Sequence, residues 1–154
     1  MEHTFNFIIQ SRKAFISLIE GMTLAELNSI PEGFNNNVIW NFGHIVVSTQ
    51  GLCYLRTGVI TDPSFVKYAS AYAKGTKPTS SVTQSEVDDL KTLAIQSIEK
   101  LKDDYHSGLF KEITPFATDT DKETLGTIEE VITLTAGHDN LHYGYAIAQK
   151  RAIK

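Results

Sequence analysis

Residues 127–151 read TIEEVITLTAGHDNLHYGYAIAQKR, and this stretch decides the fold class. Thr127 and Glu130 have the spacing of a capping box, in which two side chains satisfy free backbone N–H groups at the start of a helix. The residues that follow at alternating spacings of three and four form one stripe: Ile128, Val131, Thr135, His138, His142, Tyr145 and Gln149. The pattern predicts a helix over 127–151, with both histidines on one face that points toward the protein interior or its edge.

Three earlier stretches, 2–20, 37–57 and 84–107, also have helical periodicity. The first and the last are amphipathic, with apolar residues at helical spacing: Phe5, Ile8, Ile9, Phe15, Ile16 and Ile19, then Val87, Leu90, Ala94, Ile98 and Leu101. Residues 37–57 are apolar on most sides, which is typical of a helix that is central or covered by a second subunit. We therefore expect four long helices.

The segments between these helices carry turn residues. Residues 58–83 contain Pro63, Gly75 and Pro78, which indicates a long connection with one short helix around 63–73. Residues 108–126 are expected to form a loop with a short extended piece at 112–116. With no convincing pair of strands, the sequence predicts an all-α protein: one domain over 1–154, an antiparallel four-helix bundle whose second and third helices are joined by the long connection.

Composition narrows the functional classes. The chain has 154 residues, of which 42% are hydrophobic and 21% charged, with a net charge of −4 and no clustered basic stripe, so a nucleic-acid partner is not expected. No apolar run is long enough to span a membrane, and the amino terminus lacks a secretory pattern. Cys53 is the one cysteine, which excludes an internal disulfide and fits a cytoplasmic location.

Three histidines are the candidate metal ligands. His138 and His142 are one helical turn apart, so both rings can reach one ion at about 2.0 to 2.1 Å. His44 lies inside the apolar helix over 37–57, where an unpaired polar ring would be costly. A shared divalent metal would remove that cost for all three rings. The alternative is that each ring is a hydrogen-bonded core residue, and the spacing alone leaves both interpretations open.

Other side chains near this pattern have weaker indications. Trp40 and Tyr145 lie about one turn from His44 and His142, so both are candidates to line a pocket, although aromatic residues at this spacing are more often core. His3 and His106 are expected at the surface, and Cys53 is expected to be a core thiol on the other side of its helix. Asp139 and Asn140 are expected in solvent, and Glu129 and Glu130 at the helix start. A stripe beside the histidines contains small residues and predicts close helix packing: Leu134, Gly137, Leu141, Gly144 and Ala148.

The segments Asn36-Asn-Val-Ile-Trp-Asn-Phe-Gly-His44 and Gly137-His-Asp-Asn-Leu-His142-Tyr-Gly resemble those of the DinB-like (YfiT-like) metalloprotein superfamily. The resemblance extends over essentially the whole chain. It implies a four-helix bundle, often dimeric, with a divalent metal held by His44, His138 and His142. It leaves the reaction open, because the superfamily includes bacillithiol transferases, mycothiol-dependent maleylpyruvate isomerases and members without an assigned activity.

The leading functional hypothesis is a metal-dependent thiol S-transferase acting on a small-molecule substrate. Three neutral nitrogens leave at least one coordination position open, where bound water or a low-molecular-weight thiol would become acidic. Two alternatives are a metal-dependent hydrolase and a non-catalytic stress-response or ligand-binding bundle. Zinc and nickel are favoured as the metal, and iron is also compatible with imidazole ligands.

A homodimer is expected from the apolar surface. The helix over 37–57 is apolar nearly all round, and the helix over 127–151 presents a second, partly apolar strip formed by Ala136, Tyr143 and Ile147. One subunit is not expected to cover both surfaces, and a symmetric pair would bury them.

Overall fold

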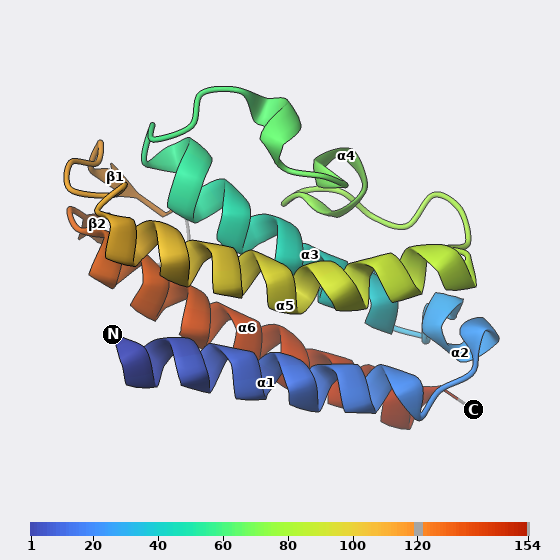
Figure 1. Cartoon of the computed structure of the whole chain (residues 1–154). Coiled ribbons are helices and arrows are strands. Elements are labelled where there is room, and N and C mark those ends of the chain that lie inside the picture. Colours follow the sequence, from blue (N-terminus) through green and yellow to red (C-terminus); the bar gives the residue numbers. More distant parts are fainter. Residues whose placement is uncertain (119–121, 154) are drawn as a thin grey trace.

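The computed structural model describes residues 1–118 and 122–153, and within them four helices are long (Figure 1). They are α1 (Glu2–Glu20), α3 (Val38–Gln50), α5 (Gln84–Ser107) and α6 (Ile128–Ala152). A π-helical turn, η1 (Gly51–Arg56), continues α3 to the end that was predicted at residue 57. All four predicted helices are therefore confirmed to within a few residues. Residues 119–121 of the predicted loop lie outside the described residues, as does residue 154.

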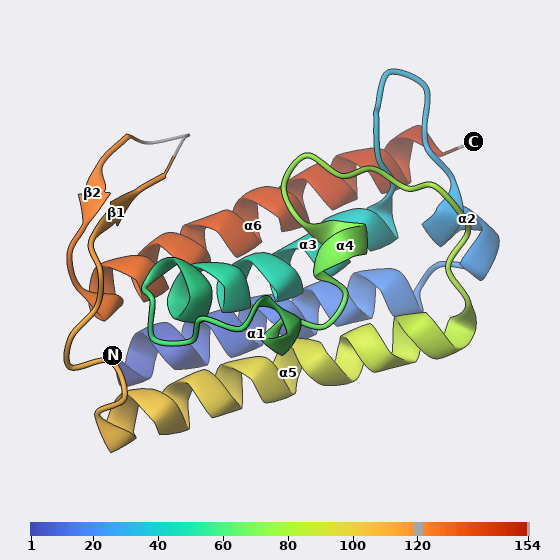
Figure 2. The ribbon, with the colours of Figure 1, turned by 90° about the horizontal axis from the view of Figure 1, so that it is seen from above.

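The four long helices pack side by side, with contacts between α3 and α6, α1 and α6, α1 and α5, and α3 and α5. The colours of Figure 1 show that α1 and α6 run in one direction and that α3 and α5 run in the other. Since α3 and α5 are parallel, the chain must return along the whole molecule between them. The long connection does this, and it passes over α3 (Figure 2).

Side-chain caps begin the helices at the residues that the sequence indicates. Asn37 accepts a hydrogen bond from the backbone N–H of Trp40, at 2.9 Å, and starts α3. Thr127 and Glu130 form the predicted capping box of α6, and a second box at Thr23 starts the short helix α2 (Leu24–Asn28). These bonds satisfy backbone donors that have no partner inside the helix.

The segments between the long helices differ from the predictions in two places. The single short helix expected around 63–73 is divided into a 3-10 turn, η2 (Pro63–Phe65), and α4 (Ala69–Tyr72). The chain also contains a strand pair that the sequence did not predict, in which β1 (Phe116–Ala117) pairs antiparallel with β2 (Thr124–Leu125). Two residues per strand are too few to show the alternation that identifies a strand.

Apolar side chains from the four long helices form two buried clusters along the molecule. Phe15, Phe42 and Leu90 belong to the first, and Phe5 and Cys53 to the second. Cys53 is 0% exposed, so it is the core thiol that the sequence predicted, and burial raises the pKa of that thiol. Within the described residues, no helix combines the length and the hydrophobicity needed to cross a lipid bilayer.

A buried ion pair joins all four long helices. Arg12 of α1 is 0% exposed and donates to Asp139 of α6 at 2.8 Å. The same guanidinium donates to the Ala94 carbonyl and Ser97 hydroxyl of α5 and to the Ile45 carbonyl and Thr49 hydroxyl of α3. The prediction that Asp139 lies in solvent is therefore wrong. The spacing within α6 could not show that α1 places a cation opposite this carboxylate.

Candidate metal centre

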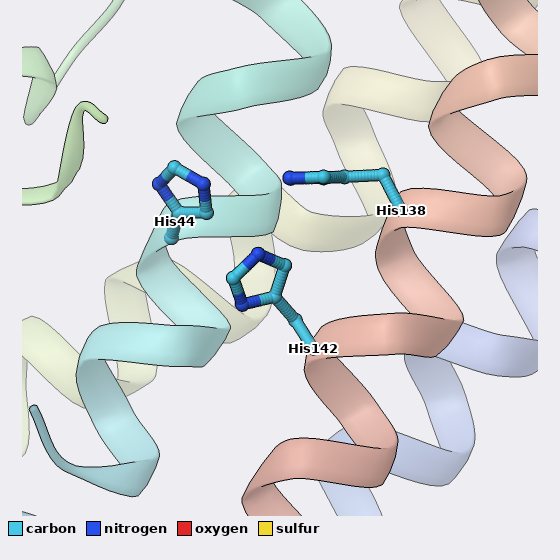
Figure 3. A group of neighbouring side chains, drawn as sticks. All are labelled: His44, His138 and His142. Atoms are coloured by element: carbon cyan, nitrogen blue, oxygen red, sulfur yellow. The ribbon is translucent and has the colours of Figure 1, made fainter. Parts of the chain in front are cut away.

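His44, His138 and His142 converge between α3 and α6 (Figure 3). One ring nitrogen from each histidine lies within 4.8 Å of the others. The ring centroids of His138 and His142 are 4.5 Å apart, and that of His44 lies 4.6 Å from His142 and 5.1 Å from His138. Within the described residues, this is the one such group of histidine, cysteine or acidic side chains. The structure therefore brings together the three residues that the sequence singled out.

Helix geometry and packing produce this convergence. His138 and His142 are separated by one turn of α6 and point the same way, toward the side of α6 that packs on α3. His44 is 6% exposed, and its ring stacks on Trp40 with a centroid distance of 4.7 Å and an interplanar angle of 10°. The Trp40 indole N–H donates to the Thr76 hydroxyl at 3.0 Å. This bond fixes the Trp40 ring on which the His44 ring stacks.

Hydrogen bonds hold two of the rings. His44 Nδ1 lies 2.7 Å from the Tyr72 carbonyl oxygen, which can only accept, so the proton is on Nδ1 and the lone pair is on Nε2. Ser48 Oγ lies 3.2 Å from that Nε2. His142 Nδ1 lies 2.7 Å from Oδ1 of Asn41. A ligand histidine is usually held in this way, through the nitrogen that does not face the metal.

Burial favours the neutral forms of His44 and His142. Burial lowers the pKa of His44, although the bond to the Tyr72 carbonyl opposes this. Burial, followed by the neighbouring His138 and His44 rings, lowers the pKa of His142 to about 3. A neutral imidazole is the form that binds a metal ion. His44 and His142 are thus neutral rings near neutral pH, each with one nitrogen lone pair that can bind a metal ion.

The donor set fits one divalent ion. Around an ion at about 2.0 to 2.1 Å, tetrahedral geometry places imidazole nitrogens about 3.4 Å apart. The separations here are at most 4.8 Å, so small side-chain rotations would close the remaining difference. Three imidazoles would leave at least one coordination position for a further ligand.

A cavity of about 1190 Å³ adjoins the histidines, and all three of them line it. It lies between α3 with η1 and α6, and α4 and the strand pair also contribute walls. Gly137 and Leu141 face this cavity, and nothing lies within 4 Å of a Cβ built on Gly137 or Gly144. The prediction that these glycines permit close helix packing is therefore wrong. Their small size instead leaves open space along α6.

Gly43 leaves room for the ring of Tyr72, whose carbonyl oxygen bonds His44. A Cβ built on Gly43 would lie 2.5 Å from the Tyr72 ring, whose hydroxyl donates to Glu86. We expect Gly43→Ala to displace Tyr72 and its carbonyl, to lower the free energy of unfolding by about 1 to 3 kcal/mol, and to weaken metal binding. Chemical denaturation and calorimetric titration would measure the two effects. Gly144→Ala is the matched control, since its Cβ meets nothing; an equal response of both variants would contradict the prediction.

The other predicted residues are placed as follows. Tyr145 is 48% exposed and packs edge-on against Phe34, and neither Tyr145 nor Trp40 is among the described residues that line the cavity. His3 is exposed, and His106 is 49% exposed with Nε2 2.9 Å from a carboxylate oxygen of Glu2. Asn140 is only half-buried, and its side chain bonds Ser11 and the Ala136 carbonyl. Glu129 and Glu130 begin α6 and also line the cavity.

Asn41 and Gln149 were not singled out by the sequence analysis, although both are 0% exposed and connect to His142. The sequence does contain an indication for Asn41, because it is a polar residue between Trp40 and Phe42 in a mostly apolar helix. Gln149 lies on the histidine stripe of α6. Buried amides need hydrogen-bond partners, and a histidine one turn or one helix away is a natural one.

The chain matches the model of a known family. A family model described as the DinB superfamily matches residues 8–146, which is most of the chain. No curated protein is similar enough to be matched. The matched range contains all three histidines.

Proposed function

Because the chain belongs to the DinB superfamily, which binds metal, we propose that His44, His138 and His142 hold one divalent metal ion. We further infer that the four long helices form one four-helix bundle, with α1 and α6 antiparallel to α3 and α5, that comprises a single domain over 1–154. In this bundle, two helices supply the ligands. The other two supply packing, and α1 also supplies Arg12, which pairs with Asp139 of α6.

We propose that the protein is a metal-dependent thiol S-transferase. The observation that carries this proposal is the position of the three imidazoles at the wall of a large cavity, where a small molecule can reach them. A divalent ion held by neutral imidazoles lowers the pKa of a thiol or water bound beside it. The chain's own residues orient the rings, while Val47, Leu52 and Leu134 provide apolar walls that exclude water from a bound electrophile.

In the proposed reaction, the sulfur of a low-molecular-weight thiol forms a bond to an electrophilic carbon. The leaving group departs with its bonding electrons, and the thiol proton goes to solvent. Cys53 cannot supply this sulfur, because it is buried in the core and the pKa of its thiol is raised. The thiol must therefore be a separate cosubstrate.

Three glutamates line the cavity: Glu123, which directly precedes β2, and Glu129 and Glu130, which are not free to act as the general base of a hydrolase. A hydrolase needs a general base that is free to take a proton from water. Glu130 accepts from the backbone N–H groups of Gly126 and Thr127, and Glu129 accepts from the Tyr105 hydroxyl. Both carboxylates are thus occupied in the structure of the helix start. A non-catalytic ligand-binding bundle would bind a small molecule without any reaction following.

The test is thiol conjugation by metal-loaded protein. Zinc, nickel and iron are the ions to load, since imidazole suits each of them. We expect at least one loaded form to accelerate the reaction of a small thiol with members of a broad panel of electrophiles. Chelation and His138→Ala should both remove the acceleration, and His3→Ala should not. Metal-loaded protein that accelerates no conjugation would exclude the transferase, and cleavage of ester probes instead would identify a hydrolase.

We also propose a homodimer, but through a different surface from the one the sequence suggested. Within one chain, α3 is covered by the long connection and Tyr143 packs on Phe15. The large apolar side chains left exposed on α6 are Leu141, at 66%, and Tyr145, at 48%. Light scattering at micromolar concentration should give about twice the 17.1 kDa chain mass, and a 17.1 kDa particle would contradict the proposal.

A further inference from the structure

The cavity is elongated, with the histidines at one end. Its lining along α6 extends from Glu129 to His142, which at 1.5 Å per residue is about 20 Å. The opposite wall extends from His44 in α3 to Arg56 in η1. Arg56 donates to the Ala117 carbonyl of the strand pair that leads into α6, so Arg56 and Glu129 lie at the same end, far from the histidines.

The chemical character changes along this length. The described side chains that line the middle are apolar or neutral: Leu52, Leu55, Val66, Thr133 and Leu134. Ionisable groups lie toward the ends, and at the far end Arg56, Glu129 and Glu130 are engaged, while Glu123 directly precedes β2. Arg56 covers the Phe116 ring at 4.9 Å, in addition to its bond to Ala117, and both glutamates at the start of α6 hold donors. The middle of the cavity therefore offers apolar contact area and no charged side chain that would favour a charged ligand.

We propose that the ligand of this cavity is an elongated amphipathic molecule. Its small polar, reactive end lies at the three histidines, and its apolar alkyl or aryl body extends along α6 toward Arg56. The placement of the reactive end rests on the proposed function. The preference for an apolar body rests on the walls alone, and it can be measured without any metal.

The test uses metal-free protein and a series of straight-chain alcohols of increasing length. Each methylene buried between the walls should tighten binding about three- to fourfold, until the chain fills the cavity. Leu134→Asn should reduce this increment, as should Leu141→Asn, whose side chain is 66% exposed and does not support the core. Leu109→Asn is the matched control, because Leu109 is 43% exposed and outside the cavity lining.

Affinity that is independent of chain length, or unchanged in both cavity variants, would overturn the proposal. Its failure is separable from that of the proposed function. Chain-length dependence that persists in a His138→Ala variant without metal would support the ligand class while removing the metal site. One bound ion per chain, together with affinity that does not depend on chain length, would support the metal site and exclude the proposed ligand class.

A second inference comes from the hydrogen bonds behind His142. Backbone carbonyls accept and never donate, so they fix the orientation of any amide that they contact. Gln149 Nε2 lies 2.8 Å from the Asn36 carbonyl, which turns its Oε1 toward Asn41 Nδ2 at 2.9 Å. Asn41 Nδ2 also lies 3.0 Å from the Asn37 carbonyl. Two carbonyls thus independently direct Asn41 Oδ1 at His142.

We infer that Asn41 and Gln149 are positioning residues that fix the tautomer of His142. Because Asn41 Oδ1 accepts, His142 must carry its proton on Nδ1, which leaves the Nε2 lone pair for the metal. Both amides are 0% exposed, so water cannot replace either of them from solvent. The orientation of the His142 ring is therefore set by the backbone carbonyls of Asn36 and Asn37, at the start of α3.

The ring nitrogen shifts of His142, measured by ¹⁵N NMR in metal-free protein, test this inference. Wild type and Asn41→Asp, which keeps the acceptor, should show the proton on Nδ1. Asn41→Leu should show a mixture of tautomers and bind metal about 10- to 100-fold more weakly, and Gln149→Leu should shift the same balance. Asn140→Leu is the matched control, since the Asn140 amide bonds the Ser11 hydroxyl and the Ala136 carbonyl. A single unchanged tautomer with unchanged affinity in Asn41→Leu would overturn the inference.

Discussion

Replacing His138 with alanine is expected to abolish metal binding. The variant keeps His44 and His142, but two imidazoles do not make the three-ligand set of an open catalytic site. Elemental analysis of protein purified without an affinity tag should give about one ion per wild-type chain and none per variant chain. The loss should occur without a comparable loss of folding, because His138 is only partly buried.

His3→Ala is the control for this experiment, since His3 is exposed near the start of α1 and far along the chain from the site. It should keep the full metal content. Metal that is retained by His138→Ala would place the ion elsewhere. A wild-type protein without stoichiometric metal would return the three histidines to ordinary core residues.

Arg12→Met is expected to lower the free energy of unfolding by about 3 to 5 kcal/mol, which is the usual cost of leaving one buried charge without its partner. The carboxylate of Asp139 is 1% exposed, and in the described residues its Oδ1 has no hydrogen bond. It therefore depends on Arg12 for compensation. The change would also remove the donors that Arg12 gives to α3 and α5. Denaturation by urea, followed by circular dichroism, would measure the loss.

The double variant Arg12→Met with Asp139→Leu separates the charge from the packing. Replacing both partners of a buried ion pair by apolar residues is often neutral or stabilising. We therefore expect the double variant to recover most of the stability lost in Arg12→Met. Equal destabilisation of the single and double variants would show that the donors to α3 and α5, and not the carboxylate, account for the effect.

The helices and the three histidines could be predicted because their signals are local. Caps and apolar periodicity lie within each helix, and His138 and His142 are neighbours in α6 whatever surrounds it. His44 could be added because a polar ring on an apolar helix implies a partner. Local patterns of this kind persist in the folded protein, so the predicted bounds agree closely with the observed ones.

The contacts between helices could not be predicted in the same way. Asp139 has a polar side chain next to a histidine, and only the position of Arg12 on another helix makes it a core residue. Gly137 and Gly144 could equally have lain against a helix or beside open space. The partners of His44 and His142 depend on how α3 meets the long connection and α6. Each of these outcomes is decided by tertiary packing, which spacing along one helix does not contain.

The Arg12 ion pair also constrains the order in which the protein can assemble. Its two residues are 127 positions apart, and the bond between Asn41 and His142 spans 101 positions. Such distant contacts form late, because the chain entropy lost in closing long loops must be offset by many contacts at once. During synthesis, α1, α3 and α5 leave the ribosome before α6, and they carry only His44 of the three candidate metal ligands. The complete candidate donor set therefore exists only once α6 has packed on α3.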